Sequence, residues 1–348
     1  MEKFTVRQMI PNTAPESYRL KIWFDVTTPK ELLFFESIME RISINHDVLF
    51  TTGSSPMVAE LCSIRNLCPT QVGEFGGTDR SQRLTIQVDR AAALSSLAQK
   101  FKPDVVISSC SIEASRVSFG LGIPHMGFSN TPYNESICRR SIPLITKLFT
   151  PSYIQVTEFT RYGITADNIV QYSALDEYLI VHNRPTPLWS AKSLNLQPNK
   201  KTIVLNIHNN SIIDIINEFP QYNIVVLTQD ANQIKSLQSF DNVIILNQAF
   251  DSQKLFSRCD VMVGYNGAMI AEAALRGIPT ILHDTTPTIN ERYLMELGIL
   301  MHTDNIIKSI KHTMLSDRHI IQKKAHQILC VMQDPYDILM DNIRTILD

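Results

Sequence analysis

The sequence has little glycine, no excess of charge of either sign and no long apolar run. Its 348 residues include 12 glycines, and 32 Lys and Arg residues stand against 34 Asp and Glu residues, for a formal net charge of -2. Hydrophobic residues make up 44% and charged residues 19%, which is ordinary globular usage and excludes a disordered or fibrous chain. The balanced charge gives no general electrostatic reason to bind nucleic acid or an anionic membrane.

The six cysteines form no recognisable framework. They show neither C-x-x-C spacing nor the Cys/His spacing of zinc fingers, and scattered thiols are typical of reduced, buried cysteines in the cytosol. No apolar stretch reaches the roughly 20 residues that cross a bilayer, and the first 18 residues lack the apolar core of a secretory signal. We therefore expect a cytoplasmic protein without a transmembrane segment. The cysteines are Cys62, Cys68, Cys110, Cys138, Cys259 and Cys330.

Motifs of several common enzyme classes are also missing. The sequence contains no G-x-x-x-x-G-K-[ST] of nucleoside-triphosphate hydrolases, no H-E-x-x-H of zinc proteases and no G-x-S-x-G of serine hydrolases. No G-x-G-x-x-G follows its first expected strand, which disfavours a dinucleotide dehydrogenase. His312, His319 and His326 recur at seven-residue spacing, about 10 Å along a helix, which is too far apart to share one metal. We expect neither a bound metal nor a cofactor.

Short runs rich in Val and Ile alternate with helical segments in both halves of the chain. This alternation predicts parallel βαβ units with helices on both faces of each sheet. Pro185, Pro187 and Pro198 interrupt the pattern and indicate a linker. We predict an α/β protein of two doubly wound Rossmann-type domains that face a central cleft. The segments are a flexible arm over 1–18, a first domain over 19–180, the linker over 181–200, a second domain over 201–330 and a helix over 331–348.

The segment that follows the strand ending at Val263 is the most informative part of the sequence. Gly264 and Gly267 open a helix of small apolar residues, and glycines there let backbone N–H groups approach an anion at the helix N-terminus. Glu272 is a lone carboxylate on that helix, and a carboxylate suits the two hydroxyls of a ribose. A simple i,i+4 ion pair between Glu272 and Arg276 is equally consistent with the spacing.

This segment resembles the donor-site signature of GT-B glycosyltransferases and the related UDP-N-acetylglucosamine 2-epimerases. The matching elements are Gly264-Tyr265-Asn266-Gly267, Glu272-Ala273, Gly277-Ile278-Pro279 and His283-Asp284-Thr285-Thr286. The resemblance implies that Glu272 binds a uridine ribose and that Gly267 and Ala268 lie near the diphosphate. We add the neighbouring loop residues to the expected substrate-binding set. These are Gly264, Asn266, Asp284 and Thr285.

The chain as a whole, from about residue 19 to 300, resembles a largely archaeal GT-B-like family, domain of unknown function family 354 (DUF354). The resemblance implies a GT-B-like architecture whose last helix packs back on the first domain. The family has no firm activity to lend, so we hypothesise from the GT-B signature that the first domain presents an acceptor and that the second binds a nucleotide-sugar. The stretches that carry the resemblance are Lys21–Asp25 with Thr28-Pro29-Lys30, Lys102–Val105, Glu113–Pro124 and Gly264–Pro279.

His208 follows the strand expected over 202–206. Its position matches a histidine near the cleft of the epimerases, and a neutral imidazole can donate a hydrogen bond to a phosphate or sugar oxygen. We treat it as a candidate catalytic residue. The alternative is that Asn209, Asn210 and Ser211 simply cap the next helix.

Candidate residues in the first domain follow strand ends. Asp25 could deprotonate an acceptor hydroxyl, or it could merely fasten its turn. Thr28 is expected to bind substrate, although Thr28 and Glu31 also have the spacing of a helix capping box. Further polar residues after strands commonly face substrate. These are Ser109, Ser111 and Asn130.

The epimerases carry a catalytic Asp in the turn that reads Ser109-Cys110-Ser111 here, and a Glu after the next strand. This sequence lacks both, and Glu113 and Glu135 are displaced from those places. Cys110 could be a nucleophile, but a buried thiol is the commoner interpretation.

We therefore predict a glycosyltransferase that uses a nucleotide-sugar, most simply a UDP-sugar, and transfers the sugar to an unknown acceptor without a metal. A UDP-sugar 2-epimerase, a nucleotide-sugar hydrolase and a non-catalytic binding protein remain alternatives. Homodimer formation is left open.

Overall fold

The computed structural model describes residues 19–74, 76–182, 196–207, 211–248, 250–265, 267–283 and 285–347. The chain divides into two compact units. Unit 1 comprises the chain up to Tyr172 together with Pro335–Asp348, and unit 2 comprises Ser173–Asp334. The boundary between the units lies after Tyr172, not at the expected residue 180. Residue 180 falls within helix α7 (Glu177–His182), which belongs to unit 2 and packs on helix α11 (Ala268–Leu275).

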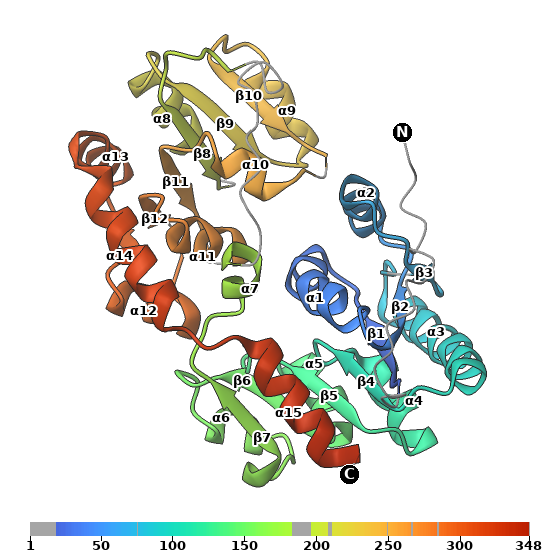
Figure 1. The fold of residues 1–348 in the computed structure, drawn as a ribbon. Coiled ribbons are helices and arrows are strands. Elements are labelled where there is room, and N and C mark those ends of the chain that lie inside the picture. Colours follow the sequence, from blue (N-terminus) through green and yellow to red (C-terminus); the bar gives the residue numbers. More distant parts are fainter. Residues whose placement is uncertain are drawn as a thin grey trace. The chain divides into compact units, whose positions relative to one another are not determined.

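Unit 1 is built on a sheet of seven strands, all paired in parallel, in the order β3-β2-β1-β4-β5-β6-β7 (Figure 1). All four residues of β4 are buried, as expected for a parallel strand covered on both faces. The strands are β1 (Lys21–Asp25), β2 (Asp47–Thr52), β3 (Thr70–Gln71), β4 (Val105–Ser108), β5 (His125–Phe128), β6 (Lys147–Pro151) and β7 (Ile169–Tyr172).

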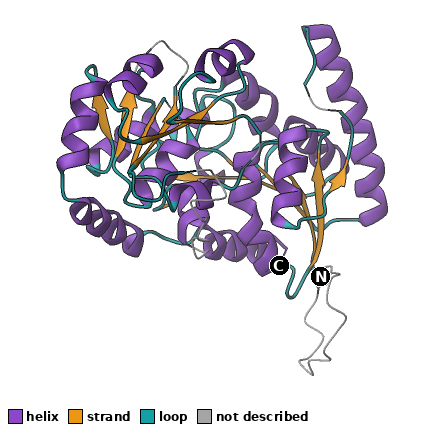
Figure 2. Ribbon diagram, turned by 90° about the horizontal axis from the view of Figure 1, so that it is seen from above, coloured by secondary structure: helices purple, strands orange, loops and turns teal. Residues whose placement is uncertain are grey.

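Helices cover both faces of this sheet (Figure 2). Aromatic rings pack between helix α1 and the strands: the Phe35 ring meets Phe24 and Phe128 edge-on at 5.7 and 5.6 Å, and Phe128 stacks on Phe149 at 4.9 Å. Such pairs stabilise the core beyond their buried area. The helices of unit 1 are α1 (Pro29–Ile42), α2 (Pro56–Arg65), α3 (Arg80–Phe101), α4 (Ile112–Leu121), α5 (Glu135–Ser141), α6 (Thr157–Thr160) and α15 (Pro335–Leu347).

The C-terminal helix α15 packs on α1. The guanidinium of Arg41 lies 3.5 Å from the ring centroid of Tyr336, and it donates a hydrogen bond of 3.3 Å to Asp337. Leu339 and Ile343 are fully buried. The chain therefore returns to the first unit after it has completed the second.

Unit 2 has a six-stranded parallel sheet in the order β10-β9-β8-β11-β12-β13. The doubly wound architecture predicted for each half is confirmed. The strands are β8 (Thr202–Asn206), β9 (Asn223–Leu227), β10 (Val243–Leu246), β11 (Val261–Gly264), β12 (Thr280–His283) and β13 (Met301–Thr303). Besides α7 and α11, the helices are α8 (Ser211–Glu218), α9 (Ala231–Leu237), α10 (Ser252–Phe256), α12 (Ile289–Glu296), α13 (Ile306–Leu315) and α14 (Arg318–Val331).

Helix α1 begins with the predicted capping box. The backbone N–H of Glu31 donates to Thr28 Oγ1 at 3.3 Å, and Glu31 Oε2 accepts the backbone N–H of Thr28 at 3.2 Å. Pro29 occupies the first turn, where its missing N–H costs nothing. The start of α1 is therefore fixed directly after the carboxyl end of β1.

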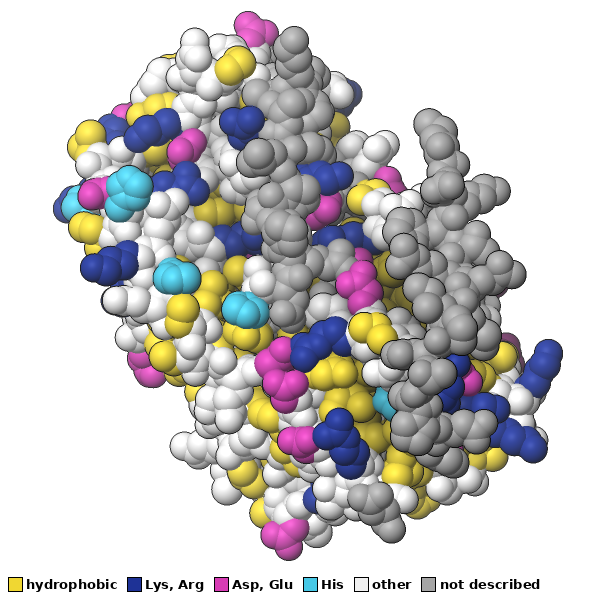
Figure 3. Space-filling model, viewed as in Figure 1, with side chains coloured by type: hydrophobic (Ala, Val, Ile, Leu, Met, Phe, Trp, Pro, Cys, Tyr) yellow, Lys and Arg dark blue, Asp and Glu magenta, His cyan; other side chains and the backbone are white. Residues whose placement is uncertain are grey.

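The surface carries both signs of charge. Acidic and basic side chains are intermixed on the face drawn in Figure 3, in keeping with the net charge of -2. Among the helices in the described ranges, none is long and apolar enough to cross a membrane.

His125 on β5 is a fully buried titratable group. Its Nε2 lies 2.9 Å from Ser108 Oγ, and its Nδ1 lies 3.3 Å from Ser118 Oγ. Burial penalises the imidazolium form and lowers the pKa of His125 to about 4, against a smaller opposing effect of Asp25. The imidazole is therefore neutral in the folded protein at pH 7.

Unit 1 should lose stability as the pH falls from 7 towards 4. In that window an unfolded His125, with its ordinary pKa near 6.5, binds a proton that the folded form rejects. The free energy of unfolding is therefore unaffected by His125 above pH 6.5. It falls as the pH approaches 4, by at most about 3 kcal/mol. Urea unfolding followed by the fluorescence of Trp23, with Trp189 replaced by Phe, measures it. His125→Gln should flatten the pH dependence, and an equally steep dependence in that variant would refute this cause.

Candidate functional site

The polar side chains of unit 1 gather where β1 and β4 end. Asp25 ends β1, Ser108 ends β4, and the two residues pair in register. The strand order reverses between these two strands, which is where open α/β sheets bind ligands. Ser109 and Ser111 follow β4, and Ser111 is the N-cap of α4, where its Oγ accepts the N–H of Ala114 at 3.3 Å.

Arg90, from the middle of α3, forms a buried ion pair with Asp25. Its Nη2 lies 2.6 Å from Asp25 Oδ1 and its Nη1 lies 3.1 Å from Oδ2, so the contact is bidentate. The two side chains are 3% and 0% exposed. Burial alone would lower the pKa of Arg90, but the Asp25 carboxylate outweighs it and holds that pKa above its ordinary value.

Two hydroxyls complete the hydrogen bonding of the Asp25 carboxylate. Thr51 Oγ1 donates to Oδ1 at 2.7 Å, and Ser111 Oγ donates to Oδ2 at 2.6 Å. Each carboxylate oxygen thus accepts two hydrogen bonds, and the group has no exposed surface. This geometry argues against the predicted role of Asp25 as a general base, because a base must reach the acceptor hydroxyl. Asp25 is instead the anchor of Arg90.

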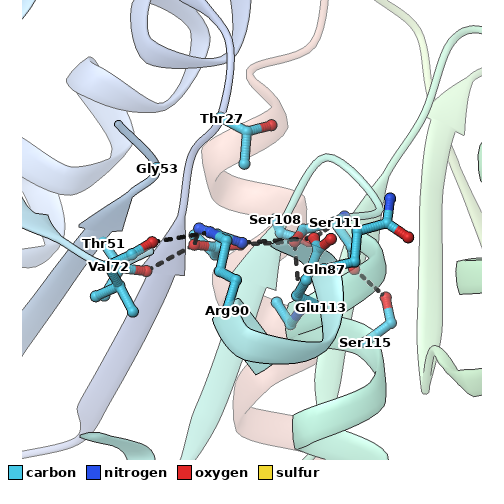
Figure 4. Close-up of polar contacts among 12 residues, drawn as sticks. Thr27, Thr51, Gly53, Val72, Gln87, Arg90, Ser108, Ser111, Glu113 and Ser115 are labelled. Carbon is cyan, nitrogen blue, oxygen red and sulfur yellow. Dashed lines mark hydrogen bonds and ion pairs between the residues drawn. The ribbon is translucent and has the colours of Figure 1, made fainter. Parts of the chain in front are cut away.

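The guanidinium of Arg90 has further partners. Its Nε donates to the carbonyl oxygen of Val72 at 3.1 Å, and its Nη1 lies 3.5 Å from Glu113 Oε2 on α4 (Figure 4). The Glu113 side chain is 12% exposed. Arg90 is therefore held by three segments, and its orientation is set before any ligand arrives.

A pocket of about 300 Å³ adjoins this network. Of the predicted residues, Thr28, Ser109 and Ser111 line it. Asn130 is buried and is not among its described lining residues. Charged residues of both signs surround the pocket, which suits a polar ligand with hydroxyl groups. Its lining includes Thr27, Glu31, Glu74, Arg83, Gln87, Arg90, Cys110, Glu113 and Arg140, with Ile86, Ile112 and Ile137 as apolar members.

Glu31 has a second role besides capping α1. Its Oε2 accepts the backbone N–H of Thr27 at 2.6 Å and the Thr27 hydroxyl at 3.1 Å, in addition to the capping contact with Thr28. All of these hydrogen bonds end on Oε2. Burial raises the pKa of Glu31, and the nearby Asp25 adds to the effect. A carboxyl group with a raised pKa at a pocket wall is suited to proton transfer.

Cys110 lines the same pocket but is not an activated thiol. It is buried, and its Sγ lies 3.3 Å from the carbonyl oxygen of Phe128. Burial raises the pKa of Cys110 well above its ordinary value, so the nucleophilic thiolate is disfavoured. The buried-thiol interpretation is therefore favoured.

In unit 2, strand order reverses between β8 and β11. Gly264 ends β11 opposite Asn206, and a Cβ on Gly264 would lie 2.8 Å from Ile270 Cδ1. Gly267 has a φ of 139° and is the N-cap of α11. Its N–H donates to Glu291 Oε1 at 3.2 Å. A diphosphate that used this N–H would have to displace a carboxylate of the chain, so the expected place of Gly267 near a diphosphate stays a prediction.

Glu272 is 2% exposed, and both of its oxygens have partners. Arg276 Nε donates to Oε1 at 3.1 Å, and Ser252 Oγ donates to Oε2 at 2.9 Å. Burial raises the pKa of Glu272, while Arg276 opposes that rise. The i,i+4 ion pair that the spacing allowed is thus formed. Because the carboxylate is almost fully buried, a ribose hydroxyl can reach it only by displacing a neighbour such as Ser252.

Three predicted residues lie outside the described residues: His208, Asn266 and Asp284. Ala268 is the first residue of α11, and Thr285 is half-buried in the loop between β12 and α12. The Gly267–Glu291 hydrogen bond joins the loop before α11 to helix α12.

Four residues of these networks were not predicted as functional: Arg90, Glu31, Ser252 and Glu291. Arg90 had a detectable signal, because it shares a buried stripe of α3 with Leu94 and Ala98 at four-residue spacing. A lone arginine on such a stripe needs a carboxylate partner.

Comparisons with known proteins find matches that cover most of the chain. A family model described as "Protein of unknown function (DUF354)" matches residues 20–348. The uncharacterized protein MJ0665 of Methanocaldococcus jannaschii is 25% identical over 343 residues, which cover 93% of this chain and 98% of that protein.

Two solved structures show the fold. The UDP-GlcNAc 2-epimerase from Neisseria meningitidis bound to UDP-GlcNAc aligns with a TM-score of 0.68 and 16% identity, over 94% of this chain and all (100%) of that one. The spinosyn forosaminyltransferase SpnP aligns with a TM-score of 0.59 and 12% identity, over 94% and 99%. The two parallel-sheet units therefore have the GT-B-like fold that glycosyltransferases and these epimerases share.

The Asp25–Arg90 pair should show strong energetic coupling. Asp25→Asn and Arg90→Met should each lower the free energy of unfolding of unit 1 by about 3–5 kcal/mol, because each leaves a buried charge without its partner. The double variant should lose clearly less than the sum. Urea unfolding of the four proteins measures the coupling. The matched cycle on the exposed pair Glu135–Arg139 should give a coupling near zero. Additive losses at Asp25 and Arg90 would contradict the proposed pairing.

Proposed function

Because the chain belongs to the family described as "Protein of unknown function (DUF354)", we propose its function from the fold and the two sites: it is a GT-B-like glycosyltransferase. It binds a nucleotide-sugar, most simply a UDP-sugar, and transfers the sugar to an acceptor hydroxyl without a metal. The observation that carries the proposal is the pocket at the β1/β4 edge, with Glu31 beside an immobilised Arg90, in a chain with a GT-B-like fold over its whole described length.

Glu31 is the proposed general base. Its described hydrogen bonds all end on Oε2, which leaves Oε1 to accept the proton of the acceptor hydroxyl. Its raised pKa favours that uptake. The acceptor oxygen then forms a bond to the anomeric carbon, and the bond from that carbon to the diphosphate oxygen breaks. In this proposal Ser109 and the second N–H of Arg90 Nη2 orient the acceptor, while the Ser111 hydroxyl stays bound to Asp25.

Unit 2 is the proposed nucleotide-binding unit. The diphosphate would meet the first N–H groups of α11, those of Ala268 and Met269, because the earliest N–H groups of a helix have no intrahelical partner. These N–H groups would stabilise the charge on the leaving diphosphate. Glu272 would exchange its Ser252 contact for a ribose hydroxyl, and Thr285 lies on the neighbouring loop.

A 2-epimerase is the second candidate, and one observation favours it. Glu31, Glu74 and Glu113 all line the unit 1 pocket, which supplies carboxyl groups that the sequence pattern did not place there. Removing and replacing the proton at C2 of a sugar needs such groups on either side. NMR of the protein with UDP-N-acetylglucosamine separates the candidates. A transferase requires an added acceptor, an epimerase yields the C2 epimer without one, a hydrolase yields the free sugar, and a binding protein yields neither product.

Glu31→Gln should reduce turnover by about 100-fold or more, the scale of general-base catalysis. The amide oxygen of Gln still accepts the Thr27 and Thr28 N–H groups, so the melting temperature should stay close to wild type. UDP release from UDP-N-acetylglucosamine with a panel of sugar acceptors measures turnover. Glu158→Gln, at a surface ion pair with Arg161, is the control. Unchanged turnover in Glu31→Gln would exclude Glu31 as the base.

Glu272→Gln should weaken UDP binding by about 1.5 kcal/mol, the lower end of the range for hydrogen bonds to charged groups. The effect stays at this end because the ribose replaces an existing partner of the carboxylate. Isothermal titration calorimetry with UDP measures it, and Glu296→Gln, on the exposed side of α12, is the matched control. If Glu272→Gln folds and binds UDP as tightly as the control, the ribose role is wrong.

A further inference from the structure

Unit 2 contains two adjoining hollows that the proposed chemistry does not use. Their volumes are about 340 and 170 Å³, and both are lined by Ser257 and Arg318. The larger one lies against α14 and the end of α11, with Arg276 and His326 in its wall. The smaller one contains Lys200 and Arg258, with Thr202, Asn223 and Asp260. The hollows therefore adjoin at Ser257 and Arg318.

This site is rich in positive charge. Lys200, Arg258, Arg276 and Arg318 line it, against the single lining carboxylate of Asp260. Glu272 adds a second negative charge through its ion pair with Arg276. Among the described residues that line the hollows or pair with their walls, four cations therefore stand beside two carboxylates.

Arg318 lies where the two hollows meet, and its hydrogen bonding is incomplete. Its Nη1 reaches Asp260 Oδ1 at only 3.4 Å, while Asp260 Oδ2 is engaged by the Thr202 N–H at 2.8 Å. Its Nε is buried and has no hydrogen-bond partner among the described residues. A buried donor without an acceptor is rare in folded proteins and points to a bound water or anion.

The site is separate from the proposed nucleotide loops. Lys200 precedes β8, and Thr202 is the first residue of that strand. Asp260 precedes β11, so these residues lie at the amino edge of the sheet. The loops at Gly264 and Gly267 follow the carboxyl edge of the same strands. Four residues of β11, at about 3.3 Å each, separate the two edges by about 13 Å.

We propose that these hollows bind a second anionic ligand, a phosphorylated small molecule that carries at least two negative charges. Arg318 would give its Nε–H to one phosphate oxygen. Lys200 and Arg258 would meet the charge in the smaller hollow, and Arg276 would meet it in the larger one. Guanidinium groups suit phosphate because they donate in a fixed fork. This inference does not require that the protein be a glycosyltransferase.

Inorganic pyrophosphate is the probe, titrated calorimetrically into the full chain with and without saturating UDP. With saturating UDP, which occupies the proposed diphosphate site of α11, wild type should still bind one pyrophosphate, and this binding should weaken as salt rises. Lys200→Gln and Arg258→Gln should each weaken binding at least fivefold. Lys235→Gln removes a charge from an exposed position on α9 in the same unit and should bind as wild type. Arg318→Gln should abolish binding, but it also removes the Asp260 contact, so the first two variants carry the test.

Three outcomes overturn the proposal. They are no binding to wild type, equal affinity of Lys200→Gln, Arg258→Gln and Lys235→Gln, and complete displacement of pyrophosphate by UDP, which would place it at the nucleotide loops. Failure of the proposed function has a different signature. UDP then does not bind at all, while pyrophosphate binding and its loss in Lys200→Gln persist.

Discussion

The buried Asp25–Arg90 ion pair is the interaction on which the unit 1 site depends. It joins the end of β1 to the middle of α3, and through Ser111 and Glu113 it also fixes the start of α4. A buried carboxylate and guanidinium persist only when each satisfies the other and the remaining donors find acceptors. Both conditions are met here, because Thr51, Ser111 and the Val72 carbonyl complete the two groups. The pocket wall is therefore rigid before any ligand binds.

The architecture could be predicted from the sequence because it follows from periodic patterns. Runs such as Val105–Ser108 and Asn223–Leu227 are almost wholly apolar and alternate with helices, which is enough to specify parallel sheets. The capping box at Thr28 is likewise local. The domain boundary was placed several residues too late because α7 is joined in sequence to unit 1 but packs on α11, and that choice depends on contacts distant in the sequence.

The site could be predicted only in part, because it too depends on contacts between residues that are distant in the sequence. The strands end at Asp25, Ser108 and Gly264, each within one residue of the predicted end, and parallel strands bring their carboxyl ends to one edge. The roles of the side chains were harder to predict. Whether Asp25 acts as a base or as an anchor depends on Arg90, which is 65 residues away. The spacing of Glu272 and Arg276 allowed both a ligand role and an ion pair, and no local pattern decides between a hydroxyl of Ser252 and one of a ribose.

The two units share one feature that affects how tightly a ligand can bind. Each unit carries a buried carboxylate, Asp25 or Glu272, that is neutralised by an arginine of the same unit. These carboxylates therefore need no ligand to be stable in the folded protein. In the nucleotide-binding role that we propose, a ribose hydroxyl would exchange one hydrogen bond of Glu272 for another, and such an exchange contributes little net free energy. Most of the affinity would then come from the charged diphosphate, and the carboxylate would contribute mainly to the choice of ribose over groups that cannot donate.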